Sequence, residues 1–494
     1  MNRKCMKINL NCHINFNLMK IALINAPYYN KNFMENIGFV EHYLRILPPL
    51  GLMYVASIIK NSGHECILID AVAEGLSKQR VLKILKKYNP QLVGFSLIVP
   101  VRSEIFEWAR YIKEKLKVKI IFGGYATLYY PEEIVSNDFI DYVIIGSATN
   151  SLPKLIEAID NDGEIENIEG IAFKKEGKII VNFPKKFEDI NSLPFPDRRS
   201  VNHRLYYSII SKNTPYSIMI TSSGCIYKCD FCPMGKFPYI ERDASKVVEE
   251  MEECHKMGIK EIDIFDDNFL FNRERVKKIC EEIIKKGIKI EWTCRARVDY
   301  GDYETLKLMK KAGCKAIFYG IETGNEEIMK REHKGISKDM VRNAIEITKK
   351  AGIKTMGFFI IGHERESKES IKETIEFALE LPLDYAQFFH MVVKPGTKLY
   401  EEVKKKIGFD YFRENLKANI SKKIPITWNN LKEKEIKKWI TRAYFSFYMR
   451  KGYIANLFNI VKIFLRKIFI KIKYSRRLWD RIKPDPGLID CATH

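Results

Sequence analysis

Three cysteines, Cys225, Cys229 and Cys232, lie close together in the run GCIYKCDFCP, with three and two residues between them. A cubane iron–sulfur cluster that only carries electrons is held by four thiolates. Three thiolates therefore leave one iron open, and an open iron can bind a substrate or a cofactor. The spacing predicts a [4Fe-4S] cluster whose fourth coordination position does chemistry.

Two other interpretations of these cysteines fit less well. A structural zinc site usually has a second Cys-x-x-Cys pair or a His-x3-5-His pair, and neither lies near this run. Buried cysteines without a ligand are common. They are expected singly within helical or strand-like patterns, which describes Cys254, Cys280, Cys294 and Cys314.

The cysteine run, with the aromatic Phe231 before its last cysteine, resembles that of the radical SAM family. The resemblance implies that the open iron binds S-adenosylmethionine (SAM) beside Phe231, and that reduction of the cluster cleaves SAM to a 5′-deoxyadenosyl radical. It also implies a partial (βα)6 TIM-like barrel and an external reductant such as ferredoxin or flavodoxin. The protein then orients and shields the reactants, since the cofactor carries the difficult step.

Six strand-like runs, separated by helical patterns, fit such a barrel. They are predicted at residues 217–221, 260–265, 289–294, 316–319, 355–361 and 385–391. The cysteines follow the first strand, at the carboxyl edge where parallel sheets bind ligands. We therefore expect the radical SAM domain at residues 201–400.

Acidic residues follow two of these strands. Asp266 and Asp267 follow the second, and the resemblance places one of them at the amino group of SAM; capping of the next helix is the alternative. Glu322 lies in the run YGIETG, between glycines that let a ligand approach the backbone. By resemblance Glu322 contacts SAM, through either the ribose hydroxyls or the amino group.

Arg297 follows the third strand and shares a face with Arg295, two residues earlier. An arginine that faces into a barrel needs an anion. The resemblance implies that Arg297 binds the SAM carboxylate or an acidic group of the substrate. For both arginines the alternative is a salt bridge at the strand end.

Short apolar runs and amphipathic stretches also alternate between residues 19 and 159. This pattern predicts an α/β fold that begins with a doubly wound, Rossmann-like parallel sheet. The expected strands are 21–25, 66–70, 92–96, 119–122 and 142–145, with helices near 50–61, 77–88, 103–116 and 151–159. We expect this domain at residues 19–165, followed by a linker with a short β segment at 166–200.

Short runs of this domain, among them PPLGLMY, GFS and FGGYAT, resemble the cobalamin-binding domain that precedes many radical SAM modules. The resemblance implies a cobalamin near Ser96, Gly123 and Gly124. No histidine follows an aspartate by two places, which excludes the Asp-x-His-x-x-Gly type of cobalt ligation. The run GSAT at 146–149 replaces the usual Gly-Glu-Gly-Glu, so a domain that keeps the fold without cobalamin remains an alternative.

The composition is that of a globular protein. The chain has 494 residues, 46% hydrophobic and 29% charged, which is enough for two or three domains and excludes a disordered protein. Cysteine spacing that suits a metal rather than disulfides indicates a reducing cytoplasm. Residues 1–18 are a leader of doubtful status: no apolar stretch makes them a secretory signal, and Met19 can begin both the chain and its first strand.

The C-terminal extension, residues 401–494, is strongly basic, with 23 Lys and Arg against 9 Asp and Glu. Apolar residues recur at helical spacing within 450–483, which predicts a basic amphipathic helix on anionic lipid at the inner membrane face. Packing on the barrel with a solvated basic face is the alternative. RNA is disfavoured because no RNA-binding module is recognisable, and no apolar stretch reaches the ~18 residues that span a bilayer.

These features together favour a radical SAM enzyme that methylates an unactivated carbon of a small molecule, a lipid or an isoprenoid. By resemblance, one SAM supplies the methyl group to cobalamin and a second supplies the radical. The first alternative is a radical SAM cyclase or carbon–carbon coupling enzyme without methyl transfer, and the second is a non-enzymatic iron–sulfur electron carrier or membrane-attached scaffold. A methylthiotransferase is disfavoured because residues 19–190 hold a single cysteine, Cys66.

Overall fold

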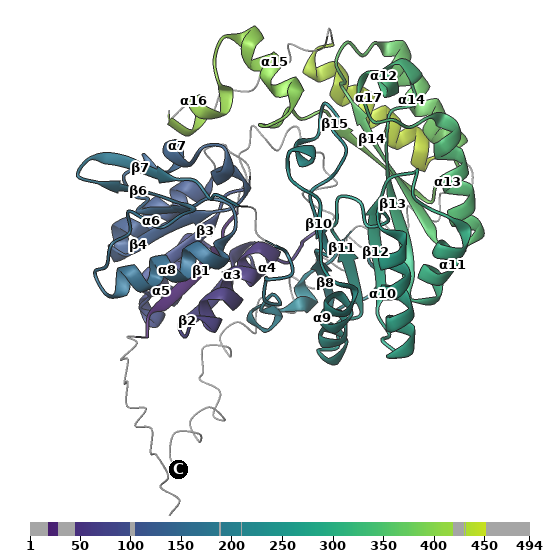
Figure 1. The fold of residues 1–494 in the computed structure, drawn as a ribbon. Helices are drawn as coiled ribbons and strands as arrows, with labels where there is room; N and C mark the ends of the chain where they lie inside the picture. Colours follow the sequence, from purple (N-terminus) through teal and green to yellow (C-terminus); the bar gives the residue numbers. More distant parts are fainter. Residues whose placement is uncertain are drawn as a thin grey trace, which may run out of the picture.

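The computed structural model describes residues 18–27, 45–98, 104–186, 189–208, 210–417, 429 and 431–450. Two sheets lie beside each other, each with its own helices (Figure 1). The doubtful leader, apart from Leu18, and the predicted amphipathic helix, apart from Arg450, lie outside the described residues.

The first sheet has seven strands in the order β2-β1-β3-β4-β5-β6-β7. The parallel strands are β1 (Lys20–Asn25), β2 (Glu65–Asp70), β3 (Leu92–Ser96), β4 (Lys119–Gly123) and β5 (Tyr142–Ile144). The central strands β1, β3 and β4 are buried on both faces over most of their length, as their continuous apolar runs require. The predicted Rossmann-like sheet is confirmed.

Helices cover both faces of this sheet. One face packs against α3 (Leu50–Asn61) and α8 (Ala148–Asp160). The other packs against α5 (Lys78–Tyr88), α6 (Glu104–Leu116) and α7 (Pro131–Val135). The two strands of the expected β segment, β6 (Ile171–Lys175) and β7 (Lys178–Asn182), join this sheet, because β6 pairs antiparallel with β5.

The second sheet has six strands, all parallel, in the order β15-β14-β13-β12-β11-β8. They are β8 (Tyr216–Met219), β11 (Glu261–Ile264), β12 (Glu291–Ala296), β13 (Cys314–Glu322), β14 (Lys354–Ile361) and β15 (Tyr385–His390). Outside them lie α9 (Ala244–Lys256), α10 (Arg273–Lys285), α11 (Tyr303–Lys311), α13 (Lys338–Lys350) and α14 (Lys368–Glu380) (Figure 1). The predicted partial barrel is confirmed, with each strand within a few residues of its expected place.

Helices after the barrel contact both sheets. The Tyr400 hydroxyl, on α15 (Lys398–Ile407), lies 3.1 Å from the Tyr130 hydroxyl of the first domain, and α16 (Tyr411–Lys417) packs on α7. Helix α17 (Glu433–Tyr448) lies along β15, where the Tyr444 hydroxyl accepts a hydrogen bond from the Phe388 backbone N–H at 3.2 Å. No helix among the described residues is both long and apolar enough to cross a membrane.

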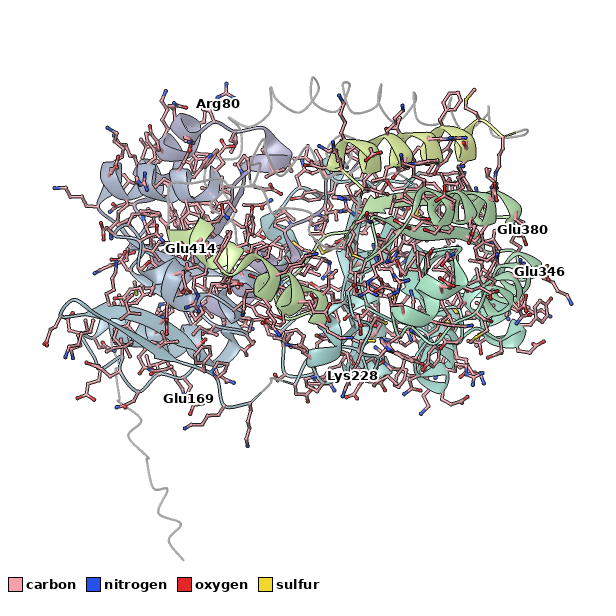
Figure 2. The ribbon with its side chains drawn as sticks, turned by 90° about the horizontal axis from the view of Figure 1, so that it is seen from above. Arg80, Glu169, Lys228, Glu346, Glu380 and Glu414 are labelled. Atoms are coloured by element: carbon pink, nitrogen blue, oxygen red, sulfur yellow. The ribbon has the colours of Figure 1, made fainter. Side chains whose placement is uncertain are left out.

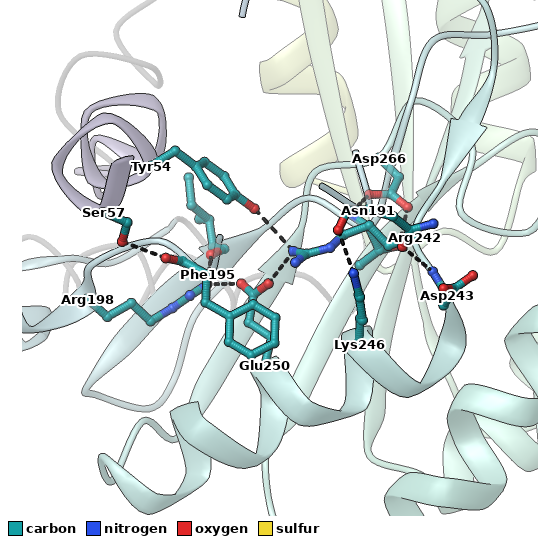
Figure 3. A network of polar contacts seen from close by, with 12 residues as sticks. Tyr54, Ser57, Asn191, Phe195, Arg198, Arg242, Asp243, Lys246, Glu250 and Asp266 are labelled. Carbon is teal, nitrogen blue, oxygen red and sulfur yellow. Dashed lines mark hydrogen bonds and ion pairs between the residues drawn. The ribbon is translucent and has the colours of Figure 1, made fainter. Parts of the chain in front are cut away.

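A buried charge network joins α3 to the barrel (Figure 3). Glu250 on α9 pairs with Arg198 at 2.7 Å and with Arg242 at 2.5 Å, and all three side chains are almost completely buried. Arg242 also donates to the Tyr54 hydroxyl of α3 at 3.4 Å. Charges removed from water need such partners, so Glu250 is central to the contact between the two domains.

Candidate cofactor site

The three cysteines lie on a tightly folded loop after β8, from Thr221 to Pro238. A Cβ atom on Gly224 would collide with the Pro238 carbonyl oxygen, and one on Gly235 with that of Tyr227. Gly224 also has φ 78°, which favours glycine. The chain passes too close to itself at Gly224 and at Gly235 for any side chain to fit. These two glycines therefore allow the three cysteines to lie within one compact turn.

The donor set of this loop fits a three-thiolate cluster. Cys225, Cys229 and Cys232 are free and only partly buried. Burial raises the pKa of each thiol, that of Cys232 to about 11, so binding a cluster must release protons from them. Among the described residues, no three His, Cys, Asp or Glu side chains converge on a single metal ion; a cluster places its ligands on different irons.

Asp266 fixes the start of the cysteine loop. Its carboxylate accepts hydrogen bonds from the Thr221 backbone N–H at 2.6 Å and from the Thr221 and Ser222 hydroxyls at 2.5 and 2.8 Å. Arg275 adds a bond from its Nη2 to the Thr221 carbonyl at 2.7 Å. Asp266 is thus fully buried and engaged by the loop, whereas Asp267 is exposed and close enough for its charge to act on Cys225.

Arg297 and Glu322 meet at Lys334, beside the cysteine loop. Arg297 Nη2 donates to the Lys334 carbonyl at 2.7 Å, and Lys334 Nζ pairs with Glu322 Oε1 at 2.5 Å. The Arg297 guanidinium also lies 3.5 Å from the ring centroid of Tyr227 and pairs with Asp299. The structure therefore brings together Arg297 and Glu322, two of the residues expected from the sequence, while Lys334 and Tyr227 were not foreseen.

Glu322 has an unusual backbone. Its φ is 70°, and the pairing of β13 with β14 shifts between Gly320 and Glu322. A left-handed conformation costs a residue with a side chain on the order of 1–3 kcal/mol and is concentrated at functional sites. The bulge turns Glu322 towards Lys334 at the carboxyl edge of the barrel.

Arg295 has its anion within the protein. Its guanidinium donates to both Asp263 oxygens, at 2.7 and 3.1 Å, and lies 3.6 Å from the Phe265 ring centroid. The alternative of a salt bridge at the strand end therefore describes Arg295, and Arg297 also makes such a pair, with Asp299 at 2.9 Å.

Phe231, within the cysteine loop, is partly buried against an apolar cluster that includes residues of the N-terminal sheet and of α15. Its ring centroid lies 6.4 Å from that of His363, edge to face. His363 Nδ1 is 2.8 Å from Glu332 Oε1, and the Asp230 backbone N–H donates to the Glu332 carbonyl at 3.3 Å. The buried Glu332–His363 pair, which the sequence did not reveal, thus contacts the loop at Asp230 and Phe231, just before its last cysteine.

Ser96, Gly123 and Gly124 lie together at the carboxyl edge of the N-terminal sheet. Gly124 has φ 103°, and a Cβ there would lie 2.8 Å from both the Leu97 carbonyl oxygen and Ser96 Oγ. Around Gly123 the nearest atom to such a Cβ is 3.9 Å away. Small residues and bare backbone form this edge, which suits a large, flat macrocycle and fits cobalamin.

The two carboxyl edges face each other through aromatic residues. Tyr125, directly after Gly124, has its ring centroid 6.4 Å from that of Phe237 in the cysteine loop. A Cβ on Gly396, after β15, would lie 2.6 Å from the Tyr129 hydroxyl. The edge that fits cobalamin is therefore next to the loop that fits the cluster.

Known proteins match this arrangement. The model of the radical SAM superfamily matches residues 219–378, and that of the B12 binding domain matches residues 38–156. Over 459 residues the chain is 30% identical to an uncharacterized methyltransferase, PH0819, of Pyrococcus horikoshii, which covers 90% of this chain and 95% of the relative. The chain belongs to the radical SAM superfamily, in the group that carries a B12-binding domain.

Two further matches bear on the reaction and the fold. An anaerobic magnesium-protoporphyrin IX monomethyl ester cyclase of Rubrivivax gelatinosus is 26% identical over 455 residues, 88% of this chain and 80% of the relative. The solved structure of TsrM from Kitasatospora setae, a radical SAM methyltransferase with cobalamin and a [4Fe-4S] cluster bound, has a TM-score of 0.65 at 17% identity and covers 79% of this chain and 78% of that one.

This radical SAM protein is an enzyme, and its cofactors are a [4Fe-4S] cluster, SAM and cobalamin. Its substrate is a small molecule, and it takes electrons from a reductant. The family, the fold class and the cofactors expected from the sequence are confirmed, and the non-enzymatic electron carrier is excluded.

Proposed function

We propose that this enzyme transfers a methyl group from SAM, by way of cobalamin, to an unactivated carbon of its substrate. The observation that carries the proposal is the opposition of the two carboxyl edges, through Tyr125 against Phe237 and Tyr129 against Gly396. A substrate carbon held between these edges meets both cofactors. The methyltransferase relative, which matches almost the whole chain, supports the same reaction.

In this proposal each expected site residue has a role. Residues 201–400 bind the cluster through Cys225, Cys229 and Cys232, and they bind SAM between Phe231, Asp267, Arg297 and Glu322. When bound, the cluster supplies the electron that cleaves SAM, and cobalamin supplies the methyl group. Asp266, placed with Asp267 in the sequence-based expectation, positions the cysteine loop instead of touching SAM.

The N-terminal domain, residues 19–165 with β6 and β7 of the following segment, binds cobalamin near Ser96, Gly123 and Gly124. At Gly124, where φ is 103° and a Cβ would meet Leu97 and Ser96, only glycine fits, and Gly123 adds no side-chain bulk to the same edge.

The second candidate function is ring closure without methyl transfer, which the cyclase relative favours. The two reactions differ in the fate of SAM. Methyl transfer gives S-adenosylhomocysteine as well as 5′-deoxyadenosine, whereas ring closure needs only the radical.

The deciding experiment is anaerobic reconstitution with iron, sulfide and hydroxocobalamin, followed by SAM and a chemical reductant. We expect both S-adenosylhomocysteine and 5′-deoxyadenosine, with the former dependent on cobalamin. 5′-Deoxyadenosine alone from cobalamin-loaded enzyme would favour the cyclase. Neither product from enzyme with a full cluster would overturn the proposal.

A lipid or isoprenoid substrate is the finer part of the proposal. It rests on the basic stretch 450–483, which has 11 Lys and Arg and one acidic residue. Flotation with anionic and neutral vesicles tests it, and enzyme truncated after residue 450 is the control. Equal recovery of both proteins with anionic vesicles would contradict membrane contact.

A further inference from the structure

We propose that the substrate of this enzyme carries an acidic group, a carboxylate or a phosphate, and that the ammonium of Lys394 binds it. The proposal rests on the proposed function only in that the substrate lies between the two carboxyl edges, and it applies to methyl transfer and to ring closure alike.

Lys394 follows the last strand of the barrel, at the carboxyl edge that carries the cysteine loop. Strand β15 ends at His390, and Met391 and Val393 pack into an apolar cluster that includes residues of the N-terminal sheet. The Lys394 carbonyl oxygen accepts hydrogen bonds from the Thr397 hydroxyl at 2.8 Å and from the Thr397 backbone N–H at 3.2 Å. These contacts fix the backbone of a turn from Lys394 to Thr397, which we call the β15 turn.

The β15 turn contacts both sides of the proposed substrate position. A Cβ on Gly396 would lie 2.6 Å from the Tyr129 hydroxyl, so the turn touches the N-terminal domain. Directly after the turn, Lys398 Nζ pairs with Asp230 of the cysteine loop at 3.0 Å. In the view from above, α15 and α16, which carries the labelled Glu414, lead from the barrel to the N-terminal domain (Figure 2). The β15 turn therefore lies where the loop that binds the cluster meets the domain that binds cobalamin.

The Lys394 side chain reaches the same place as a tyrosine of the other domain. Burial raises the pKa of the Cys232 thiol, the charge of Asp267 adds to that rise, and the Lys394 ammonium opposes it. Burial raises the pKa of the Tyr125 hydroxyl as well, and the charges of Cys232 and Asp267 add to the rise. The Tyr125 ring centroid is also 6.4 Å from that of Phe237 in the cysteine loop. The ammonium and the hydroxyl therefore approach the cluster site from opposite domains.

Lys394 differs from its charged neighbours in having no acidic partner. Lys334 pairs with Glu322 at 2.5 Å. Arg297 pairs with Asp299 at 2.9 Å. The Lys394 side chain is exposed, and it makes no ion pair or hydrogen bond with any residue that the structure describes. An ammonium binds carboxylate and phosphate oxygens through charge-assisted hydrogen bonds, so this charge is available to a ligand.

Neither cofactor needs this cation. SAM has one carboxylate, for which the proposed site has Arg297, and its sulfonium is itself positive. The amide side chains around the corrin ring of cobalamin are neutral. A substrate with an acidic group is complementary to Lys394, and a single charged side chain of this kind sets the orientation of a ligand in its site.

The test compares acidic probes with neutral probes of the same carbon chain: octanoate with octanamide, and geranyl phosphate with geraniol. Binding is measured anaerobically by saturation-transfer NMR on holoenzyme that holds the cluster and hydroxocobalamin. Lys394→Gln removes the charge and keeps most of the side chain. Lys311→Gln is the matched control, since Lys311 is exposed on α11, outside the barrel. Iron content, cobalt content and the SAM Kd show that both variants retain their cofactors.

We expect the wild type to bind one or both acids about tenfold more tightly than the matched neutral probe, as a charge-assisted hydrogen bond predicts. In Lys394→Gln the Kd of the acid should weaken to that of the neutral probe, whose own Kd stays the same. Lys311→Gln should match the wild type with every probe. A preference for octanoate or for geranyl phosphate shows whether the acidic group is a carboxylate or a phosphate.

Three results would overturn the proposal. Equal affinity of the wild type for both members of each pair would mean that the site does not select an acid. A preference that persists in Lys394→Gln would place its cation elsewhere. A SAM Kd weakened in Lys394→Gln would assign the lysine to SAM. These measurements need no turnover, so loss of acid binding and failure of methyl transfer are recorded separately.

Discussion

The carboxyl edges of the two sheets are built in different ways. At the barrel edge, charged side chains are held by one another: Glu322 pairs with Lys334 at 2.5 Å, and Arg297 pairs with Asp299 at 2.9 Å. At the N-terminal edge, Ser96 and Gly124 shape a surface of backbone and small side chains. A zwitterion such as SAM needs charges fixed in advance, whereas a large macrocycle needs room. Substitutions at the barrel edge and at the N-terminal edge should therefore affect different cofactors.

The largest effect is expected at the cysteines. Cys229→Ala leaves two thiolates, so we expect loss of the cluster and a fall of 5′-deoxyadenosine formation to background. Cobalamin binding should persist, because the N-terminal edge does not use the loop thiols. Iron and cobalt content of the reconstituted protein measure both. Cys254→Ala, at a buried cysteine outside the loop, is the control, and joint loss of cobalamin in Cys229→Ala would show that the edges depend on each other.

The next effect concerns the network that fixes the two domains together. Glu250→Gln leaves Arg198 and Arg242 buried without a counter-charge, which typically costs about 3–5 kcal/mol. Glu252→Gln on the same helix is the matched control, because its pairs with Lys256 and Lys286 are at the surface, where ion pairs contribute little to stability. Urea unfolding of the apo-protein measures both. Equal stability of the two variants would mean that the network contributes little.

A smaller effect tests the backbone of the N-terminal edge. Gly124→Ala forces a side chain into a left-handed conformation and against the Leu97 carbonyl, at a cost of about 2–3 kcal/mol. Gly123→Ala has room for its methyl group and should unfold within about 0.5 kcal/mol of wild type. We expect Gly124→Ala to weaken cobalamin binding and to leave iron content unchanged. Reduced iron content in this variant would argue against separate edges.

The elements of this fold were predictable because their signals are local. Each barrel strand is a short apolar run, and three cysteines with fixed spacing lie in one segment. The partners within the site were not predictable, because they meet only through the tertiary fold. Lys334 reaches Glu322 from twelve residues away, and Asp266 reaches Thr221 across 45 residues. The sequence places Asp266 and Asp267 at the end of the second barrel strand. Only the tertiary structure shows that Asp266 accepts hydrogen bonds from the cysteine loop.

The smallest effect concerns the buried pair beneath Phe231. Burial lowers the pKa of His363, but the hydrogen bond that its imidazole donates to Glu332 and the charges of Glu366 and Glu332 outweigh this, so the pKa is raised above its usual 6.5. A histidine whose pKa is higher in the folded than in the unfolded protein contributes its full stabilisation below the pKa of the unfolded state. This stabilisation is lost as the pH rises through the pKa of the folded state.

Glu332→Gln removes that partner, so the difference in unfolding free energy from wild type should be about 1.5 kcal/mol below pH 6.5 and should narrow at higher pH. Urea unfolding of the two apo-proteins across this range measures it. If the difference in unfolding free energy stayed constant or widened with pH, His363 would be neutral in the folded protein. The charged residues at the edge of the barrel would then not include this histidine.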